Sequence, residues 1–227
     1  MSIDLYEFGE LYHDYSIFGA KNHQIKDVFS LNQKCKAPII ISYISMAVAK
    51  SKVNINDDVS FLELFCADAY YAMLALHLGA TKSIGVDNNK IKQSGFSKSI
   101  AKKLGLKNFE FVLEDVHNAD RLGKFDIVAN VGGLYHIEDP VDVLARSYNM
   151  AKKYLIVQSV VSMRNNNPDY FEKPAPSWNW GNRFNKVSFD KMIKKFGWNI
   201  VDYHFNELIG NKNLNNRGSV YYLISCE

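Results

Sequence analysis

Two acidic residues stand where the strands of an α/β sheet would bind a ligand. Glu63 follows an apolar run and opens the segment Glu63 to Tyr71, which reads as the end of a strand, a tight loop and the start of a helix. Asp87 ends the next apolar run. In that order, the loop brings backbone N–H groups to one end of a ligand, while the later carboxylate can accept both hydroxyls of a ribose. The pattern predicts a pocket for a nucleoside.

Strand and helix signals alternate around these residues. The predicted strands are Ser60–Phe65, Ser83–Asp87, Phe109–Leu113, Phe125–Asn130 and Tyr154–Ser159. Helices are predicted over Ala69–Leu78, over Asn89–Leu104 and from Pro140, with Asp139 as the N-cap. This alternation predicts a parallel sheet with right-handed crossovers.

The two ends of the chain read differently. The first fifty residues are predicted to be helical, with Pro38 opening the apolar segment Ile39–Ala49, and to cap the sheet or the pocket. Trp198–Leu208 and Ser219–Ser225 read as strands joined by a short polar connection, which makes the pair antiparallel. We therefore divide the chain into a helical cap (1–58), a ligand-binding core (59–159), a substrate lid (160–187) and a helix with a terminal hairpin (188–227).

Length and composition indicate one soluble domain. The 227 residues are 47% hydrophobic and can bury a large core, and the formal charge of +3 is small. No nucleic-acid surface is indicated, although RNA binding stays open. Cys35, Cys66 and Cys226 lie far apart, so we expect neither a metal site nor disulfides, and the reducing cytoplasm fits best. Acidic residues interrupt Met1–Ala20, unlike a signal peptide, and no apolar run is long enough to span a membrane.

Four segments together resemble the S-adenosylmethionine-dependent class I methyltransferases. They are Glu63–Tyr71, Gly85–Asp87, Glu114-Asp115 and Gly132–Pro140. The resemblance covers Val59 to Ser159 well and the terminal hairpin loosely. It implies a Rossmann-like, mainly parallel seven-stranded α/β sheet with an antiparallel C-terminal hairpin and an N-terminal helical cap. It also implies S-adenosylmethionine as cofactor and an oxygen or nitrogen of a small molecule as methyl acceptor, in a monomer or weak oligomer.

One motif and one departure leave two other functions open. The segment Gly-Leu-Tyr-His-x-x-x-Pro, ending at Pro140, is similar to that of the tRNA wobble-uridine carboxymethyltransferase branch. Where class I enzymes usually show Glu/Asp-x-Gly-x-Gly-x-Gly, this chain has Phe65, Ala67 and Ala69 in place of the glycines. Alanine keeps the smallness of glycine but is not expected to keep a positive φ. A non-catalytic binding protein is the second alternative, and we predict that cofactor binding is retained.

The resemblance assigns roles at the cofactor site. Glu63 is expected to bind the ammonium group, with a solvated strand-end charge as the alternative, and Asp87 the ribose, with a helix cap as the alternative. Asp68 is expected to turn away from the cofactor carboxylate or to cap the next helix. Asp115 is expected to bind the adenine amino group or to cap a short helix toward Arg121. The predicted cofactor-binding residues are Glu63, Phe65, Cys66, Ala67, Asp68, Asp87, Asn88, Glu114, Asp115, Val116, Asn130 and Gly132.

Methyl transfer depends more on positioning than on acid–base chemistry. If the acceptor must lose a proton, His136 is the first candidate for the base and His204 the second, because imidazole titrates near neutrality. His136 could instead shape the pocket floor, and Tyr135 could orient the acceptor or pack in the core. The aromatic and basic segment Ser162–Phe184 reads as a lid, a binding surface or a strap across the core. The predicted substrate residues are Arg164, Tyr170, Trp178, Trp180, Arg183, Asn206 and Arg217.

Overall fold

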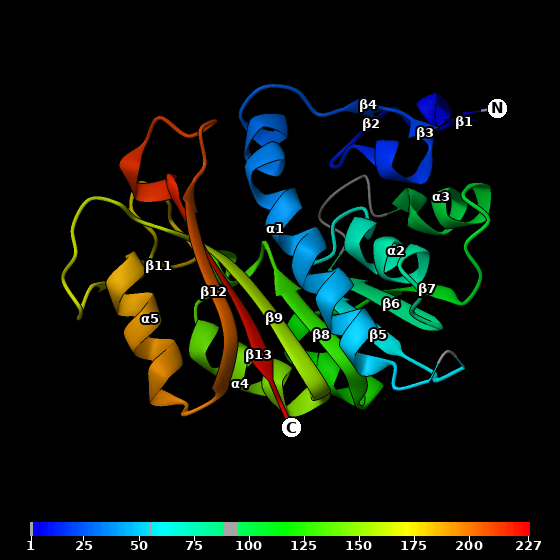
Figure 1. The fold of residues 1–227 in the computed structure, drawn as a ribbon. Coiled ribbons are helices and arrows are strands. Elements are labelled where there is room, and N and C mark those ends of the chain that lie inside the picture. Colours follow the sequence, from blue (N-terminus) through cyan, green and yellow to red (C-terminus); the bar gives the residue numbers. More distant parts are fainter. Residues whose placement is uncertain (1, 55, 89–94) are drawn as a thin grey trace.

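The computed structural model describes residues 2–54, 56–88 and 95–227, and its centre is a seven-stranded sheet (Figure 1). The strands are β5 (Ser60–Leu64), β6 (Lys82–Asp87), β7 (Phe109–Leu113), β8 (Phe125–Val131), β9 (Ala151–Val161), β12 (Asn199–Glu207) and β13 (Gly218–Ser225). They lie in the order β12-β13-β9-β8-β5-β6-β7, and only β13 pairs antiparallel with its neighbours. The predicted α/β sheet with an antiparallel terminal hairpin is confirmed.

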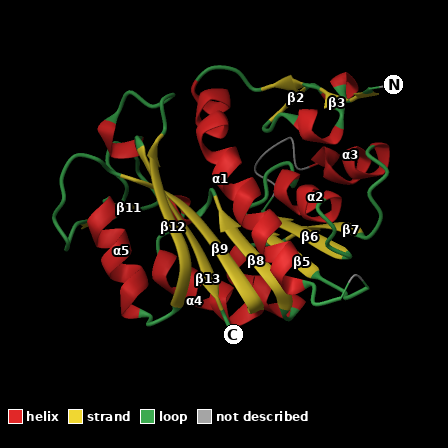
Figure 2. Ribbon diagram, viewed as in Figure 1, coloured by secondary structure: helices red, strands yellow, loops and turns green. Residues whose placement is uncertain are grey.

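Helices cover both faces of this sheet (Figure 2). One face packs against α1 (Val28–Ser51), α2 (Tyr70–His77) and α3 (Ser97–Lys103), and the other against α4 (Pro140–Met150) and α5 (Lys186–Lys195). Successive strand residues point to opposite faces, so Phe61 joins the first core and Leu62 the second. The helix predicted over Asn89–Leu104 is present as α3, and its positions 89–94 lie outside the described residues.

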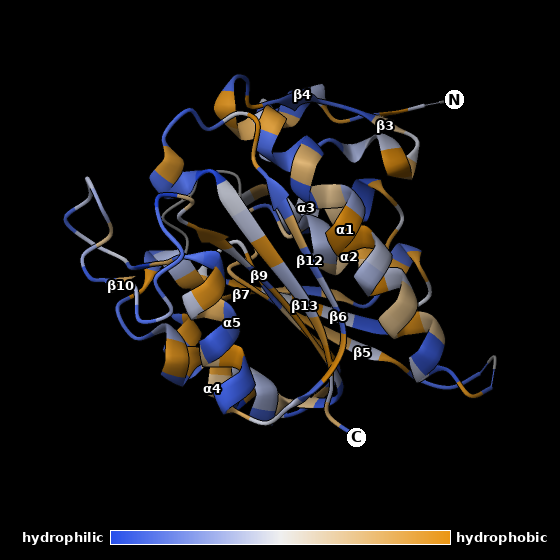
Figure 3. Ribbon diagram, turned by 60° about the vertical axis from the view of Figure 1, so that its left-hand side comes forward, coloured by the Kyte–Doolittle hydropathy of each residue, from blue (hydrophilic) through white to orange (hydrophobic). Residues whose placement is uncertain are grey.

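The helix α5 shows how sequence pattern sets these layers. Phe189, Met192 and Ile193 recur at helical spacing and are buried, while lysines occupy the opposite face (Figure 3). The N-terminus of α4 follows the predicted pattern, with Pro140 at its first positions. The side chain of Asp139 does not cap that helix but contacts Nε2 of His117 at 2.9 Å.

Residues 2–27 differ from the predicted helix. They form the short strands β1 (Ile3–Asp4), β2 (Glu10–Leu11), β3 (Ala20–Lys21) and β4 (His23–Gln24), with the 3-10 turns η1 (Tyr6–Phe8) and η2 (Tyr15–Phe18) between them. The prediction is wrong here because glycines with positive φ, Gly9 and Gly19, end both turns, and Asp14 caps η2 by accepting the N–H of Ser16. Helical structure begins only at Val28.

Pro38 lies inside α1 and not at its start, contrary to the prediction. Proline removes one helical hydrogen bond and crowds the preceding turn. The helix is 24 residues long and buries Ile40, Tyr43 and Ile44 against the sheet, so its packing outweighs the local loss.

The segment 160–187, predicted to be a lid, begins within β9 and carries β10 (Phe171–Glu172) and β11 (Arg183–Phe184), which pair antiparallel. Further 3-10 turns of the described residues are η4 (Val116–Leu122), η5 (Leu134–His136) and η6 (Leu214–Asn216). Within the described residues, no helix has the length and apolar character needed to cross a membrane.

Candidate active site

A cavity of about 630 Å³ opens at the carboxyl ends of β5, β6 and β8. Glu63, Asp87 and Val131 line it from the strand ends. The opposite wall comes from the N-terminal residues Tyr12, His13, Phe29, Gln33 and Lys36. Open parallel sheets bind ligands at the carboxyl ends of two neighbouring strands from which the chain continues in opposite directions. In this sheet β5 and β8 are such a pair, because β5 is followed by β6 on one side and β8 by β9 on the other.

The loop after β5 keeps a glycine-like backbone without glycine. Phe65, Ala67 and Ala69 have φ values of 59°, 50° and 60°, all in the left-handed region. The prediction that alanine would not keep a positive φ is therefore wrong. For a residue with a side chain, this conformation costs about 1–2 kcal/mol, so the surrounding structure must hold the loop in place.

Two hydrogen bonds to β6 and one within the loop hold this backbone in place. Cys66 donates its N–H to the carbonyl of Val86 at 3.1 Å, and Ala67 donates its N–H to Oδ2 of Asp87 at 2.9 Å. Ala69 donates its N–H back to the carbonyl of Cys66 at 2.6 Å. The loop geometry is thus fixed by β6 and by a side chain that lines the cavity.

The ring of Phe65 packs directly on Gly133. A Cβ atom added to Gly133 would collide with the ring of Phe65, so only glycine fits there. Phe65 lines the large cavity and also a smaller pocket of about 70 Å³. The smaller pocket includes Glu114, Asp115 and Val116, the residues predicted to surround the adenine. Phe65 therefore stands at the boundary between two parts of the predicted cofactor site.

Glu63 is a buried acid and not a solvated strand-end charge. It is 1% exposed, and its Oε2 accepts the N–H of Ala72 in the first turn of α2 at 2.7 Å. Burial raises the pKa of Glu63, and the nearby charges of Asp68 and Asp87 raise it further, against the hydrogen bond from Ala72. A cationic ligand would favour its charged form.

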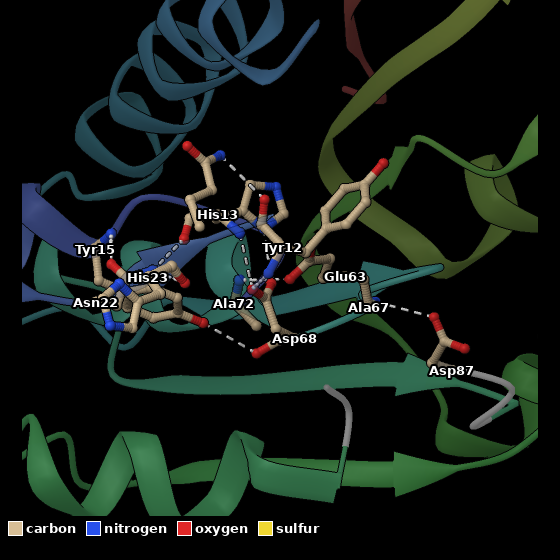
Figure 4. A network of polar contacts seen from close by, with 11 residues as sticks. Tyr12, His13, Tyr15, Asn22, His23, Glu63, Ala67, Asp68, Ala72 and Asp87 are labelled. Carbon is tan, nitrogen blue, oxygen red and sulfur yellow. Dashed lines mark hydrogen bonds and ion pairs between the residues drawn. The ribbon is translucent and has the colours of Figure 1, made fainter. Parts of the chain in front are cut away.

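Asp68 faces the N-terminal segment (Figure 4). Its Oδ2 accepts the N–H groups of Tyr12 and His13 at 3.0 Å each, and its Oδ1 lies 2.6 Å from Nδ1 of His13. The hydroxyl of Tyr15 donates to its carbonyl at 3.3 Å. Asp68 is fully buried and anchors the residues before α1 to the loop, so it turns away as expected but does not cap α2.

His136 lies on an aromatic wall of the cavity. Its ring stacks on Trp180 at 5.0 Å and on Trp178 at 5.8 Å. Burial lowers the pKa of His136 to about 4, and the charges of Arg183 and Lys36 contribute. The imidazole is therefore neutral at neutral pH, which makes it a weak base and a good hydrogen-bond acceptor.

Arg183 lies behind this wall. Its guanidinium carbon is 4.9 Å from the ring of Trp178 and 5.3 Å from that of Tyr135. The side chain is fully buried, and its three nitrogens have no hydrogen-bond partner among the described residues. Burial lowers the pKa of Arg183 to about 10. Arg183 and Tyr135 thus both pack behind the wall, since Tyr135 is only 9% exposed and neither residue lines the cavity.

The structure gathers most of the predicted cofactor residues. The large cavity is lined by Glu63, Phe65, Cys66, Ala67, Asp87, Asn88 and Gly132. Asp115 borders the smaller pocket and also caps η4 by accepting the N–H of His117 at 3.0 Å. Asn130 is buried behind the strand ends, where its Nδ2 donates to Oγ of Ser147 at 2.8 Å.

The predicted substrate residues are more dispersed. Trp180 lines the cavity, with Trp178 stacked on it at 4.4 Å. Arg164 is exposed and Tyr170 half-buried, and neither belongs to the cavity lining. The remaining two, Asn206 and Arg217, lie in or near the terminal hairpin, as does His204, the second candidate for the base. His204 is exposed on β12, Asn206 donates to the carbonyl of Cys35 at 2.9 Å, and Arg217 forms an ion pair with Glu207 at 2.7 Å.

Sequence reasoning missed one wall of the cavity. Phe29, Gln33, Lys36 and Ile40 follow one another at spacings of three and four residues and line the cavity from α1. This spacing places them on one face of a helix and was visible in the sequence. Nothing in the sequence indicated that this face of the helix, which includes the polar residues Gln33 and Lys36, lies at the ends of the strands. Gln158 on β9 was missed as well, and its Oε1 accepts the N–H of Gly132 at 2.9 Å.

Comparisons with known proteins agree with this architecture. A family model described as a methyltransferase domain matches residues 55–207. No curated protein matches the sequence. Among solved structures, the chain is similar to the N-terminal domain of EvdMO1 with bound SAH, at 14% identity and a TM-score of 0.66 over 97% of this chain and 93% of that one.

Two further solved structures are similar. Magnesium protoporphyrin IX methyltransferase from Synechocystis PCC 6803 with bound SAM has 14% identity and a TM-score of 0.63, over 89% of this chain and 86% of that one. N-methyltransferase NodS from Bradyrhizobium japonicum WM9 has 13% identity and a TM-score of 0.59, over 84% and 86%. At these identities the likeness is one of fold. With the family match, the chain belongs to the methyltransferase-domain family, within the S-adenosylmethionine-dependent class I methyltransferases.

Proposed function

We propose that the protein transfers a methyl group from S-adenosylmethionine to an oxygen or nitrogen of a small molecule. The observation that carries the proposal is the cavity at the strand ends, with Glu63 and Asp87 on one side and the stacked rings of His136 and Trp180 on another. Acids on one side suit a cationic cofactor with a ribose, and aromatic rings suit a small planar acceptor. Among the neighbours, coclaurine N-methyltransferase is bound to the small molecule N-methylheliamine together with SAH.

The residues present fit the cofactor. A cavity of about 630 Å³ lies within the usual range for small-molecule sites, roughly 300–1,000 Å³. The left-handed backbone at Phe65, Ala67 and Ala69 has the conformation for which other members of the class use glycine. This conformation removes the main reason to prefer a non-catalytic protein. Glu63 would hold the ammonium group and Asp87 the ribose hydroxyls.

When bound, S-adenosylmethionine supplies an electrophilic methyl group. The chain's own residues would hold the acceptor in line with it and exclude water. The N-terminal residues Tyr12 and His13, anchored by Asp68, close the cavity from one side. His136, with its pKa near 4, would accept a hydrogen bond from the O–H or N–H group of the substrate. This bond would orient the lone pair of the substrate oxygen or nitrogen that receives the methyl group. Residues 160–187 contribute Trp180 and would form part of the acceptor site.

Calorimetric titration with S-adenosylhomocysteine tests the cofactor site. Asp87→Ala is expected to weaken binding at least tenfold, about 1.4 kcal/mol, because the ribose would lose its carboxylate partner. Asp58→Ala is the matched control, since Asp58 is exposed before β5 and outside the cavity lining. Turnover is then tested by incubating the protein with S-adenosylmethionine and a panel of phenols, amines and acids, and by measuring the S-adenosylhomocysteine that forms. Absence of binding by the wild-type protein at millimolar concentration would refute the proposal.

A further inference from the structure

Lys36 is a buried cation in the cavity wall. It is 5% exposed, lies on α1 and lines the cavity. Within residues 2–54, 56–88 and 95–227, its ammonium group forms no hydrogen bond or ion pair. Charged groups are almost never buried unless they are paired, because removal from water strongly disfavours the charged form. A buried ammonium that faces a cavity is therefore suited to a ligand that brings the opposite charge.

The surroundings of Lys36 belong to the aromatic side of the cavity. Its charge contributes to the low pKa of His136, whereas neither Glu63 nor Asp87 is among the groups that shift the pKa of Lys36. Those acids are the residues that would hold the cofactor. The ammonium and carboxylate groups of the cofactor share one carbon atom, so its carboxylate would stay close to Glu63. Lys36 thus lies on the side assigned to the acceptor.

A second unsatisfied polar group lies beside it on the same helix. Gln33 precedes Lys36 by three residues, is 5% exposed and also lines the cavity. Its Oε1 is buried without a hydrogen-bond partner among the described residues. Behind the aromatic wall, the fully buried guanidinium of Arg183 adds positive potential without reaching the cavity. One wall therefore brings an ammonium group, an amide side chain and flat rings together.

We propose that the methyl acceptor is a planar molecule with a carboxylate, and that Lys36 binds this carboxylate. The inference rests on the proposed function and adds the substrate class. The rings of His136 and Trp180 would pack on the planar part. A single ammonium balances one negative charge, which fits a carboxylate better than a phosphate ester with nearly two.

The test uses benzoate and its uncharged counterpart benzamide, titrated by calorimetry into the full-length protein saturated with S-adenosylhomocysteine. Benzoate is expected to bind wild-type protein at least tenfold more tightly than benzamide. Lys36→Met is expected to abolish this preference and Lys36→Arg to retain it. Lys34→Met is the matched control, because Lys34 lies on the same helix but is exposed, and it should leave the preference unchanged.

Equal binding of benzoate and benzamide by the wild-type protein, or a preference that survives in Lys36→Met, would overturn the inference. A tenfold loss of S-adenosylhomocysteine affinity in Lys36→Met, with unchanged affinity for 5′-deoxy-5′-methylthioadenosine, would assign Lys36 to the cofactor carboxylate and would also overturn it. The benzoate titration is repeated without S-adenosylhomocysteine. If S-adenosylhomocysteine does not bind, that result counts against the proposed function. The titration without it still measures whether Lys36 prefers benzoate to benzamide.

Discussion

Replacing Ala67 by glycine should stabilise the protein. Ala67 has a φ of 50°, and relief of this left-handed conformation is worth about 1–2 kcal/mol. Glycine also gives the unfolded chain more freedom, which takes back about 0.4–1 kcal/mol. Ala67 lines the cavity, so removal of its methyl group is not expected to open a void in the packed core. The net expectation is a gain of about 0.5–1 kcal/mol, or roughly 2 °C in Tm for a chain of this size.

Urea and thermal unfolding, followed by circular dichroism, measure this gain. The matched control is Ala49→Gly, because Ala49 is an exposed residue within α1, where glycine costs about 1 kcal/mol relative to alanine. The two substitutions make the same chemical change and should shift Tm in opposite directions. If Ala67→Gly lowers Tm as much as Ala49→Gly does, the loop is not held in the left-handed region and the reasoning is refuted.

Three further predictions concern neighbouring contacts. Gly133→Ala should destabilise the protein by about 1–3 kcal/mol, because the new Cβ would meet the ring of Phe65, and Phe65→Ala in the same chain should restore part of the loss in urea unfolding; additive effects would contradict the contact. Lys36→Met should raise the free energy of unfolding at pH 7 by about 3 kcal/mol, since the pKa of Lys36 falls from 10.5 to about 8 on folding. Between pH 8 and pH 10.5 only the unfolded state holds the proton, so the wild-type protein regains this stability as the pH rises. The advantage of Lys36→Met should therefore vanish by pH 11. A difference in unfolding free energy that stays constant with pH would contradict the prediction. Asp68→Asn should increase limited proteolysis of residues 2–27 several-fold while the sheet remains folded, because the carboxylate that contacts His13 is replaced by an amide. An unchanged cleavage rate would show that Asp68 does not anchor this segment.

The inner part of the central sheet could be predicted from the sequence because β5, β8, β9 and β13 are mostly buried on both faces and therefore read as apolar runs. The segment before α1 could not, since its buried residues Leu5, Leu11 and Tyr15 belong to a series of short strands and turns and not to one continuous element. Its position depends on a distant partner, Asp68, which the sequence pattern does not connect to residues 12 and 13.

The candidate site divides in the same way. Glu63 and Asp87 could be placed from the sequence because the ends of parallel strands meet at one edge of a sheet. The α1 wall could not, because a helix can present any face to a sheet until its packing is known. Arg183 illustrates the same limit, since its guanidinium lies buried against two aromatic rings and outside the cavity lining, although the sequence around it is polar.

The separation of charges within the cavity favours ligand binding over stability. If Lys36 lay beside Glu63, the two groups would pair and the empty site would neutralise itself. Glu63 instead takes its hydrogen bond from Ala72 at the start of α2, and Lys36 stays unpaired on α1 among the described residues. Each buried charge then disfavours folding, as the lowered pKa of Lys36 and the raised pKa of Glu63 indicate. Such a cost is typical of functional sites, where residues are kept for their ligands at the expense of stability. A cationic donor near Glu63 and a carboxylate near Lys36 would remove both costs at once, so the two ligands should stabilise the protein against unfolding more than either alone.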